Sequence, residues 1–149
     1  MVISIGASIV GFVGIVALID RILGFFHITL AQIFSYIFAP FGFLMGFEGD
    51  AIFMEGALLG NKLILNEFIA FGELAGKLSS LDARTALVAI ISLSGFANIS
   101  SMGICIGGIG VLAPEKRGTI SRLIFRAMLG GVLVSINSAL LVSMVSLFW

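Results

Sequence analysis

Of the 149 residues, 60% are hydrophobic and 11% are charged, and eight Lys and Arg balance eight Asp and Glu. A soluble domain carries about 25% charged residues, so this composition, with its mean hydropathy of +1.23, excludes a soluble globular enzyme and indicates a protein whose solvent is lipid. The zero net charge argues against nucleic-acid binding, and a single cysteine (Cys105) and a single histidine (His27) argue against a disulfide, a metal site or a Ser-His-Asp triad.

Residues 1–19 carry no charged side chain and are expected to form a first membrane-spanning helix. A span needs roughly 20 apolar residues, which this run supplies. A signal peptide would have a basic start, a shorter apolar region and a small-residue cleavage site. This run instead ends directly at Asp20 and Arg21, so we do not interpret it as a signal peptide.

The next charge-free run, residues 22–47, combines seven phenylalanines with scattered polar groups. Such a mixture is typical of a helix lying at the membrane–water interface. Pro40 and Gly42 are expected to end that helix near Ala39, and we interpret His27 as an interfacial side chain. A second spanning helix is the alternative for this run.

Residues 48–82 hold the densest charge, interrupted by two short apolar pieces, Ala51 to Gly60 and Leu63 to Ala75. Each piece is too short to cross a bilayer but long enough to enter halfway and return. We therefore predict a re-entrant helical hairpin with its turn at Gly60 and Asn61. Irregular backbone at membrane depth is tolerated only where protein buries it or a water-filled cavity meets it.

Residues 85–114 form a longer apolar run with a cluster of Ser, Gly and Asn at 94–101. Such a cluster favours two half-helices with unwound backbone between them, which in secondary transporters form substrate sites near the bilayer midplane. A continuous helix whose small residues serve packing is the alternative.

Between this run and the apolar run 127–149 lies a charged loop at 115–126, in which four of five charges are positive. The positive-inside rule places the loop in the cytoplasm. The chain then begins in the cytoplasm, the hairpin opens outside and the C-terminus lies outside.

Two segments contain candidate binding residues. Glu67 lies near the hairpin tip, where an ionised carboxylate costs about 2–4 kcal/mol unless it is paired or hydrated; accepting hydrogen bonds from a polar ligand is one reason for it to be there. An ion pair with Lys62 or Lys77, or exposure at the surface, is the alternative.

Asn98 and Ser101 share a helix face, and Phe96 adds a flat apolar surface. This mixture suits a ligand with a ring and hydroxyl groups, and equally suits two helices bonded to each other.

These segments carry a family resemblance. The string G-N-K-L-I-L-N-E-F-I-A-F (60–71), followed by S-G-F-A-N-I-S-S-M-G-I-C-I-G-G-I-G-V-L-A-P-E-K-R (94–117), resembles the concentrative nucleoside transporter family, as does the stretch from Tyr36 to Gly46. The resemblance covers nearly the whole chain but only the C-terminal half of the family's fold.

The resemblance implies an all-α polytopic membrane protein containing one inverted-repeat unit. Its expected parts are a scaffold helix (2–20), an external interfacial helix (28–46), a re-entrant hairpin (51–78), a broken helix (84–112) and a final helix (120–147). The family pattern N-E-F corresponds to Asn66, Glu67 and Phe68, and its glutamate contacts ribose. Asn98 and Ser101 would bond the ribose and neighbouring groups, and Phe96 would line the pocket.

The resemblance further implies a cation-coupled nucleoside symporter, a homotrimer in the cell membrane, and in bacteria the inner membrane. We expect this chain to be the C-terminal half, cut from a longer chain or acting with a separate N-terminal half that holds most of the coupling Na+ or H+ site. It would need no cofactor or metal of its own and would not be an enzyme. A non-transporting membrane assembly protein and an inactive truncation product are the alternatives.

Overall fold

The computed structural model describes the backbone of residues 2–148 and the side chains of residue 6, residues 10 and 11, and residues 13–148. Its secondary structure is helical, and the all-α fold predicted from the sequence is confirmed. The α-helices in the described range are α1 (Val2–Gly24), α2 (Leu30–Leu44), α3 (Asp50–Ile64), α4 (Glu67–Ala75), α5 (Ala83–Leu93), α6 (Ile99–Leu112) and α7 (Arg117–Val145). Short 3-10 turns lie at Leu78–Ser80, Pro114–Lys116 and Ser146–Phe148.

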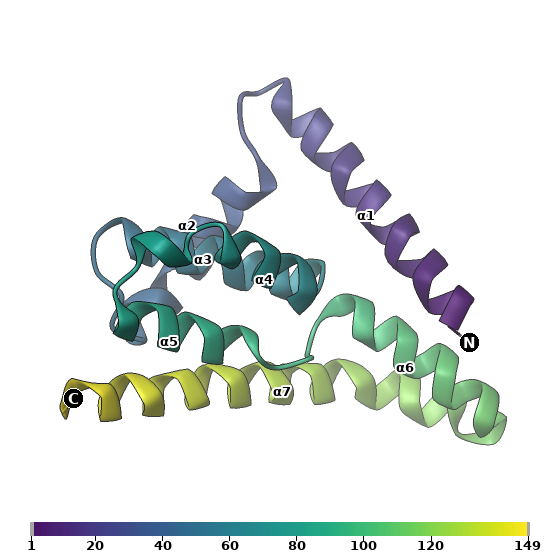
Figure 1. The fold of residues 1–149 in the computed structure, drawn as a ribbon. Coiled ribbons are helices and arrows are strands. Elements are labelled where there is room, and N and C mark those ends of the chain that lie inside the picture. The colour runs from purple at the N-terminus through teal and green to yellow at the C-terminus, as the bar shows by residue number, and fades with distance from the viewer. Residues whose placement is uncertain (1, 149) are drawn as a thin grey trace.

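The long helix α7 forms one side of the molecule, and α5 and α6 lie end to end along it (Figure 1). Helices α2, α3 and α4 form a group packed on α5, while α1 leans away from them toward α6. The start of α2 is tied to α1 by the Asp20 carboxylate, whose Oδ1 accepts a hydrogen bond from the Leu30 amide at 2.8 Å. The chain therefore places α5, α6 and the α3–α4 pair around one point above the middle of α7.

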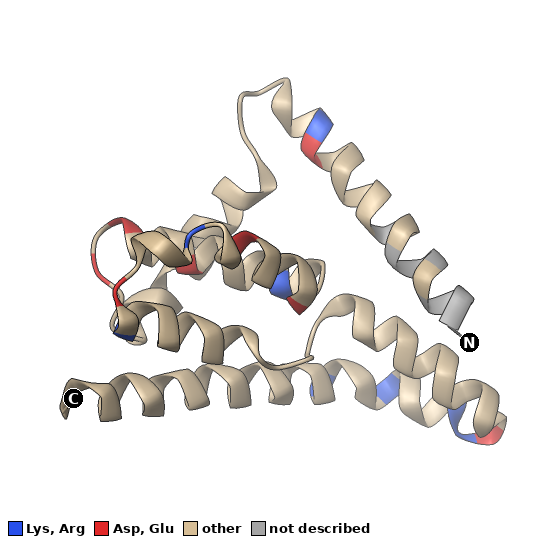
Figure 2. Ribbon diagram, in the orientation of Figure 1, with Lys and Arg blue, Asp and Glu red and all other residues tan. Residues whose placement is uncertain are grey.

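Among the described residues, one continuous helical stretch, Pro114–Phe148, is long and apolar enough to cross a membrane. Its 35 residues extend about 50 Å, more than the roughly 30 Å of a hydrocarbon core. Figure 2 shows basic residues only toward the N-terminal end of α7. The final helix expected over 120–147 lies within this stretch.

The course of α2 corrects one expectation, because Pro40 does not end the helix: α2 continues to Leu44. Proline lacks the N–H that would bond the carbonyl four residues earlier, a loss of about 3 kcal/mol in a helix interior. Close packing against α3 holds the helix on both sides of it. Before the proline, a Cβ on Gly56 would collide with the Ser35 carbonyl, and after it a Cβ on Gly42 would lie 2.8 Å from the Ile52 oxygen.

The turn of the hairpin is also displaced from its expected place at Gly60 and Asn61. Both residues lie inside α3, which runs to Ile64 before Leu65 and Asn66 make the turn into α4. Gly60 serves close packing, since a side chain there would collide with Phe34. Asn61 links the two helices, because its Nδ2 donates to both carboxylate oxygens of Glu73 at 2.9 Å.

The run 85–114 is interrupted at residues 94–98, between the end of α5 and the start of α6. Asp82 caps the start of α5 by accepting a hydrogen bond from the Thr85 amide at 3.0 Å. The end of α5 is closed by Ser94, whose amide and hydroxyl both donate to the Ile91 carbonyl. The break therefore has its own hydrogen bonds, and it lies where the sequence has its Ser, Gly and Asn cluster.

The apolar core lies where α2, α3, α4, α5 and α7 meet. Its fully buried side chains include Met45, Leu58, Leu74, Val88, Leu93 and Ala139. Arg84 ties this group to α7, because its guanidinium donates to the Gly46 carbonyl at 3.1 Å and to the Ser143 hydroxyl at 2.7 Å. This packing joins the α3–α4 hairpin to α5, the helix that ends at the break.

Candidate functional site

The hairpin presents Glu67 at the first position of α4. Asn66 occupies the N-cap, and its side-chain oxygen accepts a hydrogen bond from the Ile69 amide at 3.0 Å. Asn is among the preferred N-cap residues because its oxygen satisfies a backbone donor that the helix leaves free. Glu67 is half-buried and lies where the positive end of the helix dipole favours a carboxylate. Asn66 therefore caps the start of α4, and Glu67 places a carboxylate in the first turn of this helix.

The break presents Asn98 at the N-cap of α6, joined to Ser101 by a capping box. The Ser101 amide donates to Asn98 Oδ1 at 2.7 Å, and the Asn98 amide donates to Ser101 Oγ at 3.1 Å. This reciprocal pairing satisfies two backbone donors at once. Asn98 is 2% exposed, so the start of α6 is held in a defined position.

The two segments meet through one hydrogen bond: Asn98 Nδ2 donates to Glu67 Oε2 at 2.8 Å. The starts of α4 and α6 therefore converge, although 31 residues separate these two side chains in the chain. We call Glu67, Asn98 and Ser101 the junction. The alternatives left open for Glu67 were an ion pair with Lys62 or Lys77 and plain surface exposure. Glu67 is instead half-buried and accepts a hydrogen bond from the Asn98 amide, while the Lys62 ammonium donates to the Ser92 carbonyl.

Two aromatic side chains lie next to the junction in the sequence and are largely exposed. Phe96, within the break, is 75% exposed, and Phe68, directly after Glu67, is 84% exposed. A buried or half-buried set of carboxylate, amide and hydroxyl groups beside exposed rings can bind a molecule that has both hydroxyl groups and a flat ring. The family resemblance included Phe68 in the N-E-F pattern but assigned it no contact with the ligand.

Beneath the junction lies a buried polar network that the sequence analysis did not identify. Ser92, on the last turn of α5, donates its hydroxyl to Glu55 Oε1. The backbone carbonyl of Ser92 accepts a hydrogen bond from Lys62 Nζ at 2.7 Å. Glu55 and Ser92 are 0% exposed and Lys62 is 1% exposed. The signal available in the sequence was that Glu55 lies within a short apolar piece and that Lys62 lies between the two pieces.

The break rests on α7 at Gly95. A Cβ on Gly95 would overlap the Ser135 hydroxyl of α7 and would lie 3.5 Å from Lys62 Nζ. The Ser135 hydroxyl donates to the Gly131 carbonyl at 3.2 Å within α7. Glycine at this position therefore allows α7 and Lys62 to approach the break closely.

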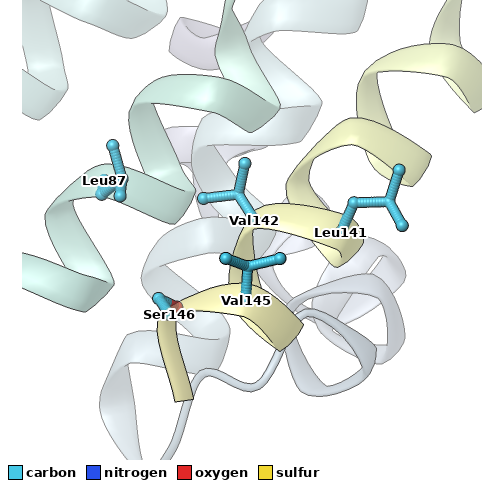
Figure 3. Close-up of a pocket in the computed structure, with 5 residues that line it drawn as sticks. All are labelled: Leu87, Leu141, Val142, Val145 and Ser146. Carbon is cyan, nitrogen blue, oxygen red and sulfur yellow. The ribbon is translucent and has the colours of Figure 1, made fainter. Parts of the chain in front are cut away.

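An apolar hollow in the described part of the chain lies apart from the junction. It has a volume of about 280 Å³ and lies between α5 and the end of α7, lined by Leu87, Leu141, Val142, Val145 and Ser146 (Figure 3). Its four lining residues from Leu141 to Ser146 lie six to eleven positions beyond Ser135, about 9–16 Å along the helix axis. Its aliphatic lining offers few groups for binding a polar molecule.

The sequence matches, over residues 1–143, the family model described as Na+ dependent nucleoside transporter C-terminus. It is 37% identical over 147 residues to the purine nucleoside transport protein NupG of Bacillus subtilis, covering 97% of this chain and 37% of that protein. It is 30% identical over 161 residues to sodium/nucleoside cotransporter 1 of Sus scrofa, covering 93% and 25%.

The fold also matches a solved structure, that of CNTnw in an inward-facing substrate-bound state. The TM-score is 0.85 at 31% sequence identity, over 95% of this chain and 35% of that chain. The chain thus spans a quarter to just over a third of the length of the proteins it matches.

Proposed function

This chain belongs to the family of Na+-dependent nucleoside transporter C-terminal domains, and from that membership we propose that it is the part of a cation-coupled nucleoside symporter that contacts the ribose. The family is one of membrane transporters and not of enzymes, as the sequence predicted. The resemblance indicated by the two long motifs is confirmed.

The hydrogen bond between Asn98 and Glu67 is the observation that carries the proposal. It brings a carboxylate and an amide to the point where the N-terminal ends of α4 and α6 converge. Carboxylate oxygens are strong acceptors for hydroxyl donors, and a ribose offers such hydroxyls side by side. Glu67 would accept from the ribose, Asn98 and Ser101 would bond the ribose and neighbouring groups, and Asn66 would hold the start of α4 in place.

The ring of the nucleoside would lie on Phe96. This side chain belongs to the break and is 75% exposed, which leaves a flat apolar face next to the polar junction. Aromatic rings favour stacked or edge-to-face contacts with other rings. One end of the ligand would then be held by hydrogen bonds and the other by its ring.

We propose that a second, N-terminal transporter half completes the pocket, either in the same longer chain or as a separate chain. Inverted-repeat transporters bind substrate and coupling ion at the interface of the two repeats. The matched proteins are roughly three to four times as long as the part this chain covers. The second half would supply most of the cation site, and the assembled protein would be a homotrimer in the cell membrane.

The orientation in the membrane follows from the basic loop. Lys116, Arg117, Arg122 and Arg126 lie at the N-terminal end of the one stretch that qualifies as a span among the described residues. The positive-inside rule places this end in the cytoplasm. The N-terminus would be cytoplasmic, α2 would lie at the external interface, the α3–α4 hairpin would enter from outside, and the C-terminus would be external.

Uptake of radiolabelled uridine tests the transport proposal. The chain is expressed alone, and together with the N-terminal part of a matched relative such as NupG, in cells that lack nucleoside uptake of their own. We expect uptake only from the pair, and loss of that uptake in Glu67→Ala. Glu48→Gln, which changes an exposed carboxylate before α3, is the control and should transport normally. Absence of uptake from every pairing, with the chain present in the membrane, would contradict the proposal.

A further inference from the structure

The carboxyl end of α5 carries an unusual partner. The last four carbonyls of a helix have no donor within the helix, and together they make that end negative. At α5 one of these carbonyls, that of Ser92, accepts a hydrogen bond from the ammonium group of Lys62 at 2.7 Å. Lys62 comes from α3, thirty residues earlier, and is 1% exposed.

A second buried ionisable group, the carboxylate of Glu55, lies on α3 together with Lys62. Glu55 also reaches Ser92, whose hydroxyl donates to Glu55 Oε1. Its other oxygen, Oε2, is buried and has no hydrogen-bond partner among the described residues. An unpaired buried charge is strongly destabilising, and here the two groups lie close together, because the Lys62 ammonium contacts the backbone carbonyl of Ser92 and the Glu55 carboxylate contacts its hydroxyl.

Discontinuous helices of secondary transporters explain what the charge can do. Their half-helix carboxyl ends and unwound carbonyls coordinate the coupling cation, while their N-terminal ends face substrate. In this chain the N-terminal end at the break carries Asn98 and the junction. The carboxyl end is already occupied by Lys62, and a Cβ on Gly95, inside the break, would lie 3.5 Å from Lys62 Nζ.

We propose that Lys62 is a built-in cation that occupies the carboxyl end of α5 in place of a bound metal ion, and that it thereby positions the break so that Asn98 meets Glu67. Lys62 is a positioning residue, since it acts on the junction through Ser92 and the backbone of the break. That this positioning serves nucleoside binding rests on the proposed function. The contact between Lys62 and the Ser92 carbonyl does not depend on it.

Amide hydrogen exchange of the full chain in nanodiscs tests the inference without any transport. The probes are the amides of Ser94, Asn98 and Ser101, each hydrogen-bonded at the break. Lys62→Met keeps an unbranched side chain but removes the ammonium. We expect exchange at these amides to rise at least tenfold, while Lys77→Met, which changes an exposed lysine after α4, leaves it unchanged. Wild-type exchange in Lys62→Met would mean that Lys62 only fills space, and would overturn the inference.

A second variant covers the case in which Lys62→Met does not fold because Glu55 is left as an uncompensated charge. Glu55→Gln combined with Lys62→Met removes both charges and leaves a neutral core. We expect this double variant to fold, as judged by its helical circular dichroism, and still to expose the break amides. Their protection at the wild-type level in the double variant would overturn the inference.

The ionic composition gives an independent check. Because the ammonium is tethered, exchange of the break amides in the wild type should be the same in NaCl and in choline chloride. Slower exchange in NaCl would show that a metal ion binds at this end of α5, and would overturn the inference. These outcomes are distinct from failure of the proposed function, which is measured by uptake of the assembled pair.

Discussion

Asn98 performs two tasks that can be separated by substitution. It caps α6 through Oδ1 and holds Glu67 through Nδ2. Asn98→Ala removes both, and we expect a loss of stability of about 1 kcal/mol from the cap together with weaker nucleoside binding. Asn98→Asp keeps the cap acceptor but places a second carboxylate against Glu67.

Asn98→Asp should therefore lower the thermal unfolding temperature at least as much as Asn98→Ala, because two carboxylates repel each other at this buried position. It should also bind nucleoside at least tenfold more weakly than the wild type. Circular dichroism on heating measures the first effect and radioligand binding to the assembled transporter measures the second. Equal binding by Asn98→Asp and the wild type would show that the contact with Glu67 has no part in the site.

Gly95 provides a second residue-scale prediction, because its lack of a side chain allows α7 to contact the break. Gly95→Ala should destabilise the protein by about 1–3 kcal/mol, as overpacking does, since the new methyl group overlaps Ser135 Oγ. Gly103→Ala is the matched control in α6, where a Cβ meets no atom within 4 Å. Ser135→Ala removes the overlapping hydroxyl and should restore part of the stability when combined with Gly95→Ala. Absence of any rescue in thermal unfolding would contradict this account.

At the scale of elements, α2 and α3 form the most extensive helix–helix contact among the described residues. Gly56 lies against the backbone of α2, where a Cβ would be 2.9 Å from the Ala39 nitrogen. Gly56→Ala should therefore lower the free energy of unfolding by about 1–3 kcal/mol, although alanine is the better helix former. Gly72→Ala on α4, with open space around it, should be neutral or slightly stabilising in the same denaturation experiment.

Local sequence signals predicted the helices but not all of their ends. Charge-free runs located α1 and α7, because the solvation of apolar side chains does not depend on distant residues. The Ser, Gly and Asn cluster located the break, because these residues act on the local backbone. Pro40 and Gly60 gave wrong helix ends because their local preferences are overridden by packing of α2 on α3. That packing depends on residues distant in sequence, such as Phe34 against Gly60.

The same distinction holds for the site. Glu67, Asn98 and Ser101 could be proposed from the cost of polar groups in lipid and from the family motifs, and the structure brings them together. The network of Glu55, Ser92 and Lys62 could not be predicted, because nothing in the sequence pairs α3 with the last turn of α5. Sequence patterns gave Lys62 only the role of a possible partner for Glu67, whereas it binds the Ser92 carbonyl.

At the scale of the whole molecule, the proposed orientation can be tested by labelling. The native Cys105 is replaced by serine, and single cysteines are introduced by Gly118→Cys at the basic loop and by Leu147→Cys near the C-terminus. We expect a membrane-impermeant maleimide added to intact cells to label the second variant and not the first. Labelling of Gly118→Cys from outside would reverse the topology and with it the side from which the hairpin enters.

The most direct test of the central claim, that the junction receives the ribose, pairs a change in the protein with a change in the ligand. Binding of uridine and of 2′,3′-dideoxyuridine is measured for the assembled transporter with wild-type Glu67 and with Glu67→Gln. A hydrogen bond to a charged group contributes about 1.5–3 kcal/mol, so the wild type should bind the dideoxy compound at least tenfold more weakly than uridine. Glu67→Gln should discriminate much less between the two ligands. The same discrimination in both proteins would contradict the account, because the ribose hydroxyls would then be recognised elsewhere.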